Sequence, residues 1–115
     1  MYCVNVIQWF LPKVVIFVTG QTFGLLAVAL TYLKDPDNAR AAYNQALTLD
    51  KRDPAIALNC AIFLYNLELH KESIEKLSHF ENRVIALREQ GMETDADIVK
   101  AALGLCKELN YDMTG

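Results

Sequence analysis

The dipeptide Asp-Pro occurs twice in this chain of 115 residues, at Asp35-Pro36 and Asp53-Pro54. An aspartate carboxylate accepts hydrogen bonds from the unpaired N–H groups at a helix N-terminus, and proline suits the first helical position because it has no N–H to leave unpaired. Proline also disfavours helical geometry in the residue before it, so each dipeptide ends the preceding element. The two are 18 residues apart, which is room for one helix and a short turn. We therefore predict helix starts at Pro36 and Pro54.

The segments after these starts carry helical patterns of apolar residues. Between the dipeptides, one stripe consists mostly of alanine: Ala39, Ala42, Tyr43, Ala46 and Leu49. The run 55–67 is apolar on nearly all sides, so both of its faces must be covered. The segment from about 71 to 88 is amphipathic, with these residues on its apolar side: Ile74, Leu77, Phe80, Val84 and Leu87.

A last helix is predicted after Gly91 interrupts the pattern. Thr94 and Asp97 have the spacing of a capping box, in which the first side chain caps the helix. The helix, within 94–110, is predicted to bury one stripe: Ile98, Ala101, Ala102, Leu105 and Leu109. Since no long stretch alternates with a period of two, we predict an all-α fold of antiparallel helical hairpins, an α-solenoid fragment with a C-terminal helix.

The N-terminal third is unusually apolar: residues 14–33 carry no charge over 20 positions, and Lys13 is the only charged residue before them. The length meets the requirement for a membrane span. A signal peptide fits poorly, because the apolar run is too long for one. Small and polar residues around Gly20 favour a third interpretation, in which the run divides and its second part, from Thr22 to Leu33, forms a buried helix. The span and the buried helix both remain open at this point.

The pattern resembles the tetratricopeptide repeat, a helix–turn–helix unit of about 34 residues. Within 20–53, these residues match positions at which the family prefers small, aromatic or bulky apolar side chains: Leu26, Ala27, Leu30, Ala39, Tyr43 and Ala46. In the next unit, the matching residues are Cys60, Ala61, Leu64, Ser73, Leu77 and Phe80. The chain departs from the pattern where Lys51 replaces a proline, Glu68 replaces a turn glycine and Phe80 replaces a small residue.

The resemblance narrows to the repeat-containing subunits of the BBSome, a ciliary trafficking complex. It is carried by the uninterrupted run Leu25-Leu-Ala-Val-Ala-Leu-Thr, by the triplet Leu64-Tyr65-Asn66 and by the residues around Leu49-Asp50-Lys51. It covers about 23–109, so the chain looks like a truncated version or a fragment. We predict an unrelated N-terminal segment (1–22), one repeat unit (23–53), a degenerate unit (54–90) and a C-terminal helix (94–110).

The resemblance implies a non-enzymatic scaffold in the cytoplasm, at the cilium base, the centrosome or centriolar satellites. The implied partners are BBSome subunits and centriolar satellite or motor-associated proteins. The alternative function is a small membrane-anchored helical adaptor with a span near 14–33, and a membrane contact is open only through the N-terminal segment. Because fewer than about three repeats are usually marginally stable, self-association is also predicted.

In tetratricopeptide proteins the first helix of each pair lines a concave binding face. Transferred by spacing, the concave positions are Val28, Thr31, Tyr32, Leu58, Ile62, Tyr65 and Asn66. The family's carboxylate clamp needs cations there, and this set contains none, so we predict no clamp. An apolar groove favours a partner helix instead. Packing of the same side chains against the N-terminal segment or neighbouring repeats is an equally open alternative.

Several functions are excluded by the residue types. The formal net charge is −3, and the longest basic cluster is Lys51-Arg52, so no nucleic-acid surface is predicted. The three cysteines are widely spaced, at Cys3, Cys60 and Cys106, so we predict no disulfide framework. Neither they nor the two histidines have the spacing of metal ligands, so we predict no metal site. We predict Cys60 and Cys106 to be small buried side chains. No nucleophile motif or glycine-rich phosphate loop occurs, so we predict no catalytic residues and no cofactor.

Overall fold

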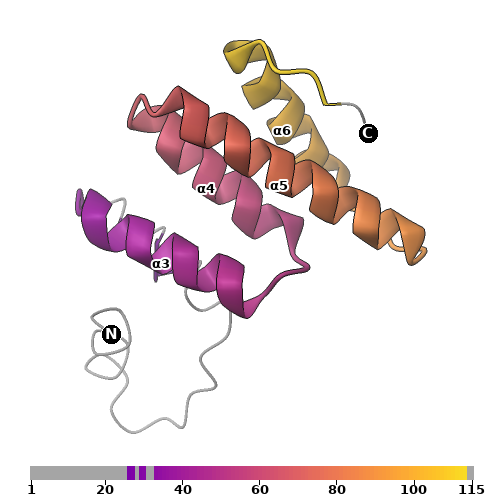
Figure 1. The fold of residues 1–115 in the computed structure, drawn as a ribbon, viewed down its shortest axis with the longest axis horizontal. Helices are drawn as coiled ribbons and strands as arrows, with labels where there is room; N and C mark the ends of the chain where they lie inside the picture. Colours follow the sequence, from indigo (N-terminus) through magenta and orange to yellow (C-terminus); the bar gives the residue numbers. More distant parts are fainter. Residues whose placement is uncertain (1–25, 28, 31–32, 114–115) are drawn as a thin grey trace, which may run out of the picture. The chain divides into compact units, whose positions relative to one another are not determined.

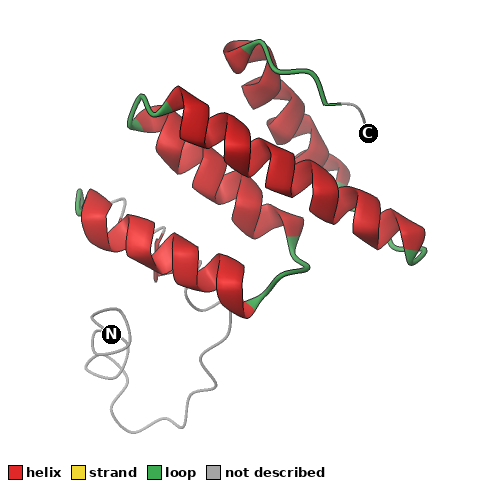
Figure 2. Ribbon diagram, viewed as in Figure 1, coloured by secondary structure: helices red, strands yellow, loops and turns green. Residues whose placement is uncertain are grey.

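A computed structural model describes residues 26–27, 29–30 and 33–113 (Figure 1). Residues 26–27 and 29–30 are helical, and they precede four helices with defined bounds: α3 (Pro36–Leu49), α4 (Pro54–Asn66), α5 (His70–Glu89) and α6 (Ala96–Leu109). The same residues contain no strand, which confirms the predicted all-α helical-hairpin fold (Figure 2). The chain divides into two units on either side of the bond between Asp50 and Lys51.

The predicted N-terminal segment, 1–22, and most of the predicted span at 14–33 lie outside the described residues. Among the residues that are described, no helix has the length and apolar character that crossing a membrane requires. The predicted repeat boundaries at 23–53 and 54–90 stay predictions, although α4 and α5 both fall within the second range.

Both Asp-Pro helix starts are confirmed. The Asp35 carboxylate accepts from the backbone N–H of Asn38 at 3.4 Å and from its side-chain amide at 2.8 Å. Asp53 accepts from the backbone N–H of Ala55 at 2.9 Å, and a proline occupies the first turn of both helices. In each case the carboxylate satisfies an N–H group that the helix cannot pair by itself.

The capping box predicted from Thr94 is wrong. Asp95 is the N-cap of α6, and its carboxylate accepts from the backbone N–H of Asp97 at 2.8 Å. A carboxylate placed one residue later takes the capping role, since it also offsets the positive end of the helix dipole. The Thr94 hydroxyl is instead buried with no hydrogen-bond partner in the described part of the chain.

Left-handed residues follow the helices at Lys34, Glu68, Gly91 and Asn110, with φ between 54° and 80°. At each one, the next residue's N–H bonds to the carbonyl five positions earlier, as Leu69 does to Leu64 at 3.0 Å. This is the Schellman arrangement, which satisfies carbonyls left over at a helix end. Lys34 and Glu68 are separated by 34 positions, which is the length of the repeat that the sequence resembles.

Helices α4 and α5 pack as an antiparallel hairpin, side by side in Figure 1. Ser73 of α5 is fully buried, and its hydroxyl donates to the Ala61 carbonyl of α4 at 2.7 Å. Small side chains at both positions let the two backbones approach closely. The core of this unit consists of Ile56, Ala57, Leu58, Cys60, Ala61, Phe63, Leu64, Leu77 and Phe80, with Ala102, Leu105 and Cys106 from α6.

The predicted apolar stripe is confirmed in most of α3 and only in part in α5 and α6. In α5, Leu77 and Phe80 are buried, whereas Ile74, Val84 and Leu87 are half-buried. In α3 the four residues from Ala39 to Ala46 in the stripe are buried, but Leu49 is 49% exposed because it is the last residue of the helix. In α6 the buried residues are Ala102, Leu105 and Cys106. Of the other residues in the predicted stripe, Ala101 is exposed, and Ile98 and Leu109 are half-buried. Burial of Cys60 and Cys106 is confirmed.

Replacing Glu68 with glycine is expected to stabilise the protein. A residue other than glycine in the left-handed region costs the folded state about 1–2 kcal/mol. Glycine removes this cost, but its greater conformational freedom in the unfolded chain offsets part of the gain. We expect Glu68→Gly to raise the free energy of unfolding by about 1 kcal/mol, measured by urea denaturation. Glu68→Ala is the control, because it removes the charge but keeps the Cβ. An equal gain in both variants would contradict the conformational explanation.

Candidate functional site

The concave positions predicted in α4 lie along one side of that helix. Leu58 is only 4% exposed and belongs to the core, whereas Ile62 and Tyr65 are half-buried and Asn66 is exposed. The other three predicted positions lie outside the described side chains: Val28, Thr31 and Tyr32. The accessible part of this surface is therefore its C-terminal end, near the turn into α5.

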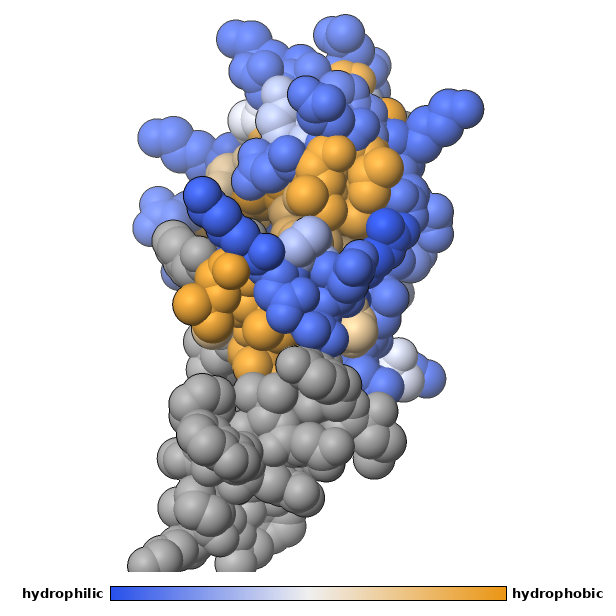
Figure 3. Space-filling model, turned by 90° about the vertical axis from the view of Figure 1, so that its left-hand side faces the viewer, coloured by the Kyte–Doolittle hydropathy of each residue, from blue (hydrophilic) through white to orange (hydrophobic). Residues whose placement is uncertain are grey.

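An aromatic pair fixes that end of α4. The Tyr65 ring stacks on the His70 ring across the turn, with centroids 5.2 Å apart and planes 15° from parallel. Leu67, between them in sequence, is 39% exposed. Seen from the side that carries this turn, the surface shows apolar regions among the hydrophilic side chains (Figure 3). A half-buried aromatic ring beside an exposed leucine is a composition typical of protein contacts.

A larger apolar hollow lies between α5 and α6. It consists of two adjoining cavities of about 370 Å³ and 300 Å³ that share Val84, Arg88, Val99 and Leu103. We call the two together the α5–α6 groove. The first cavity is also lined by Met92, Glu93, Thr94, Ala96 and Lys100, and the second by Phe80, Glu81, Ile85 and Met113.

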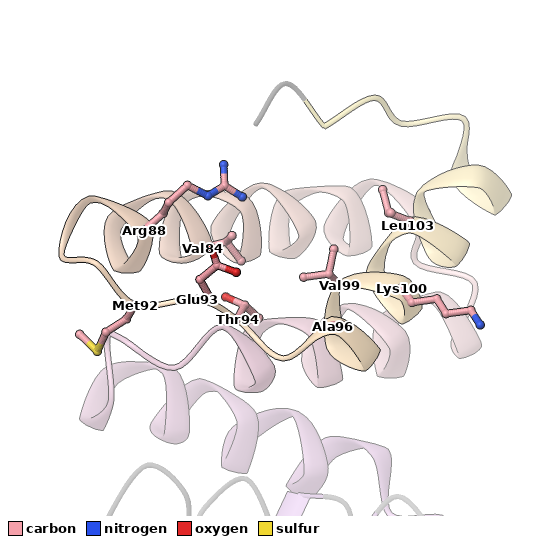
Figure 4. Close-up of a pocket in the computed structure, with 9 residues that line it drawn as sticks. All are labelled: Val84, Arg88, Met92, Glu93, Thr94, Ala96, Val99, Lys100 and Leu103. Atoms are coloured by element: carbon pink, nitrogen blue, oxygen red, sulfur yellow. The ribbon is translucent and has the colours of Figure 1, made fainter.

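The groove has an apolar floor and a charged edge. Val84 of α5 and Val99 of α6 face the space between the two helices (Figure 4). Leu103 is 54% exposed and Met92 is 42% exposed, so both offer apolar area that a partner could cover. Covering apolar surface contributes about 25 cal/mol per Å², and methionine adapts to partners of irregular shape.

The groove exists because α6 packs only partly against the hairpin. Helix α5 has 20 residues and α6 has 14, and the loop after Gly91 brings the chain back along α5. Helix α6 contacts α4 and α5 far less extensively than these two contact each other. Burial, followed by the nearby Glu81 carboxylate, raises the pKa of the Cys106 thiol, so Cys106 is kept as a neutral thiol between the helices.

The groove combines apolar side chains with charged residues at its edge, a composition that suits binding of another molecule. No group of three His, Cys, Asp or Glu side chains that could hold a metal ion occurs in the residues the structure describes. The sequence pattern predicted Val84 as an apolar position but missed Leu103 and Met92. Leu103 lies outside the buried stripe of α6. A leucine on the outer side of an amphipathic helix was the sequence signal that could have identified it as part of a binding surface.

Cysteine alkylation can measure how firmly α6 is held. Cys106 of α6 and Cys60 of α4 are both buried, but sparse packing lets α6 open locally at lower free energy. We expect iodoacetamide to label Cys106 at least ~10-fold faster than Cys60 in the native chain, a difference of about 1.4 kcal/mol. The raised pKa of Cys106 works against this result, so faster labelling reports opening. Equal native rates, with equal labelling in denaturing urea as the control, would contradict it.

Comparison with known proteins shows that this chain is similar to part of a BBSome subunit. The chain is 46% identical over 78 residues, 68% of its length, to the BBSome complex member BBS4 of Xenopus tropicalis. It is 40% and 38% identical over 84 residues, 72% of its length, to BBS4 of Mus musculus and Bos taurus. No protein-family model and no solved structure matches the chain. It spans 15–16% of the length of these relatives, and over most of its own length it resembles a part of BBS4.

Proposed function

We propose that this chain is a non-enzymatic scaffold that binds other proteins, as part of a BBSome-type subunit. The observation that supports this proposal most is the exposed apolar groove beside the packed α4–α5 hairpin, in a chain that resembles part of a BBSome complex member. The proposed partners are BBSome subunits, with centriolar satellite or motor-associated proteins as further candidates. The proposed location is the cytoplasm at the cilium base, the centrosome or centriolar satellites.

The α5–α6 groove is the main proposed docking surface, and its proposed occupant is an amphipathic helix. Its two cavities share four side chains and are lined by both helices, an arrangement that can receive apolar residues spaced i, i+3 or i+4, and i+7 on a partner helix. Arg88 and Lys100 on the edge, with Glu81 and Glu93, offer charges of both signs. Such an edge contributes to orientation and specificity more than to affinity.

The concave side of α4 is a second proposed contact surface. Ile62 and Tyr65 offer apolar area, and Asn66 offers an amide that donates and accepts. Tyrosine is enriched at binding hot spots because it buries a large ring while keeping a polar tip. Buried Leu58 supports this surface from within the core.

Charge introduced into the groove is expected to reduce partner recovery. Leu103→Glu places a carboxylate where an apolar residue would dock, and Leu103 is exposed enough that stability should change by no more than about 0.5 kcal/mol. In ciliated cells expressing the tagged full chain, we expect this variant to recover ~10-fold less of the BBSome subunits, quantified by mass spectrometry. Leu49→Glu, at a leucine that is 49% exposed, is the matched control.

Two results would count against the proposal, at different levels. If Leu103→Glu recovers the same subunits as the unaltered chain, the groove is not the docking surface. If the unaltered chain recovers no BBSome or centrosomal protein, the scaffold function is wrong. Circular dichroism of each variant separates loss of binding from loss of folding.

A further inference from the structure

The hydroxyl of Thr94 is buried in the wall of the α5–α6 groove without a hydrogen bond. Its Oγ1 atom is shielded from solvent and has no hydrogen-bond partner in the described part of the chain. Thr94 lies in the loop that leads from α5 into α6, and it lines the same cavity as Val84 of α5 (Figure 4). We call the arrangement in the structure, with α6 against α5, the closed form. A hydroxyl that leaves water without gaining a hydrogen bond destabilises this form by roughly as much as burying one leucine side chain stabilises it.

Few side chains hold α6 in the closed form. Of its 14 residues, Ala102, Leu105 and Cys106 are buried, whereas eight of the 13 residues of α4 are buried. Leu105 is the largest of the three, and alanine and cysteine remove little apolar area from water. The unpaired hydroxyl therefore offsets a substantial share of the packing that keeps α6 closed.

Each of the two helices has its own local end, so the loop between them can act as a hinge. The backbone N–H of Met92 bonds to the Leu87 carbonyl of α5 at 2.9 Å, and the Asp95 carboxylate accepts from the N–H of Asp97 in α6 at 2.8 Å. Neither bond joins one helix to the other. Rotation of the two residues between Met92 and Asp95 therefore moves α6 as a unit and leaves both helix ends intact.

The closed groove is too small for a whole helix. Its cavities of about 370 Å³ and 300 Å³ have the size of sites for small molecules, whereas a helix with its side chains is about 10 Å across. The closed form can thus receive side chains from one face of a partner helix. Separation of Val84 on α5 from Val99 on α6 would let the backbone of that helix follow.

We propose that α6 is a movable lid, which opens away from α5 in the free chain and closes onto a partner helix. The Thr94 hydroxyl favours the open form, because water reaches it once α6 has moved. An occupant that holds α6 away from α5 removes the same cost, so the hydroxyl favours the occupied groove over the closed and empty one. The inference rests on the proposed function for its occupant, whereas opening is a property of the free chain.

Alkylation of the full chain by iodoacetamide tests opening, with mass spectrometry to separate the rate at Cys106 from the rate at Cys60. The variant is Thr94→Val, which keeps the shape of the side chain and removes the unpaired hydroxyl. Thr48→Val is the matched control, because the Thr48 hydroxyl is exposed on α3 and already donates to the Asn44 carbonyl at 2.9 Å.

We expect Thr94→Val to slow labelling of Cys106 by ~10-fold and to leave Cys60 unchanged, since removal of the unpaired hydroxyl stabilises the closed form alone. We expect Thr48→Val to change neither rate. In ciliated cells, we expect the tagged Thr94→Val chain to recover ~3-fold less of the BBSome subunits, because fewer chains are in the form that admits a partner.

Three results separate the parts of this inference. An unchanged rate at Cys106 in Thr94→Val, or equal slowing at Cys60, would overturn the lid. Slower labelling with unchanged recovery would overturn the role of opening in binding. If the unaltered chain recovers no BBSome subunit, the proposed function fails, and the labelling rates still decide whether α6 opens.

Discussion

Helices α4 and α5 approach each other closely because small side chains lie between them. Ala61 and Ser73 are fully buried, and the Ser73 hydroxyl donates to the Ala61 carbonyl at 2.7 Å. A larger side chain at either position would separate the helices and lose contacts around Leu77 and Phe80, which are equally buried. The turn at Glu68 makes this approach possible, because its left-handed backbone ends α4 and lets α5 return along it.

In this hairpin, α5 also contacts other parts of the chain on two further sides. One side receives α6 incompletely and leaves the apolar α5–α6 groove, with Leu103 more than half exposed. Another side meets the segment before α4, where Arg83 donates to the Asp53 carbonyl at 2.8 Å. The groove lies on a helix whose inner face is packed against α4, so it is presented with little need for reordering on binding. This arrangement suits the proposed scaffold function.

The sequence predicted the fold class and the starts of α3 and α4, because Asp-Pro acts through local chemistry that needs no tertiary context. The prediction of Thr94 as the capping residue was wrong, because Asp95 is the N-cap of α6. The predictions at Leu49 and Ala101 were also wrong, since helical spacing defines a stripe but not where a neighbouring helix ends or how it is rotated. The α5–α6 groove was not predictable in this way. It depends on how α6 lies against α5, which is set by packing between distant residues.

Hydrogen–deuterium exchange of the full chain, alone and with a purified BBSome preparation, tests whether a packed hairpin presents the α5–α6 groove to a partner. We expect slow exchange throughout α4 and the first half of α5, unchanged by the partner, because those amides are in the packed hairpin. We expect faster exchange from 91 to 109 in the free chain, and added protection between 84 and 103 when the partner is present. Rapid exchange in α4, or protection that appears only away from the groove, would contradict this role of the hairpin and the groove.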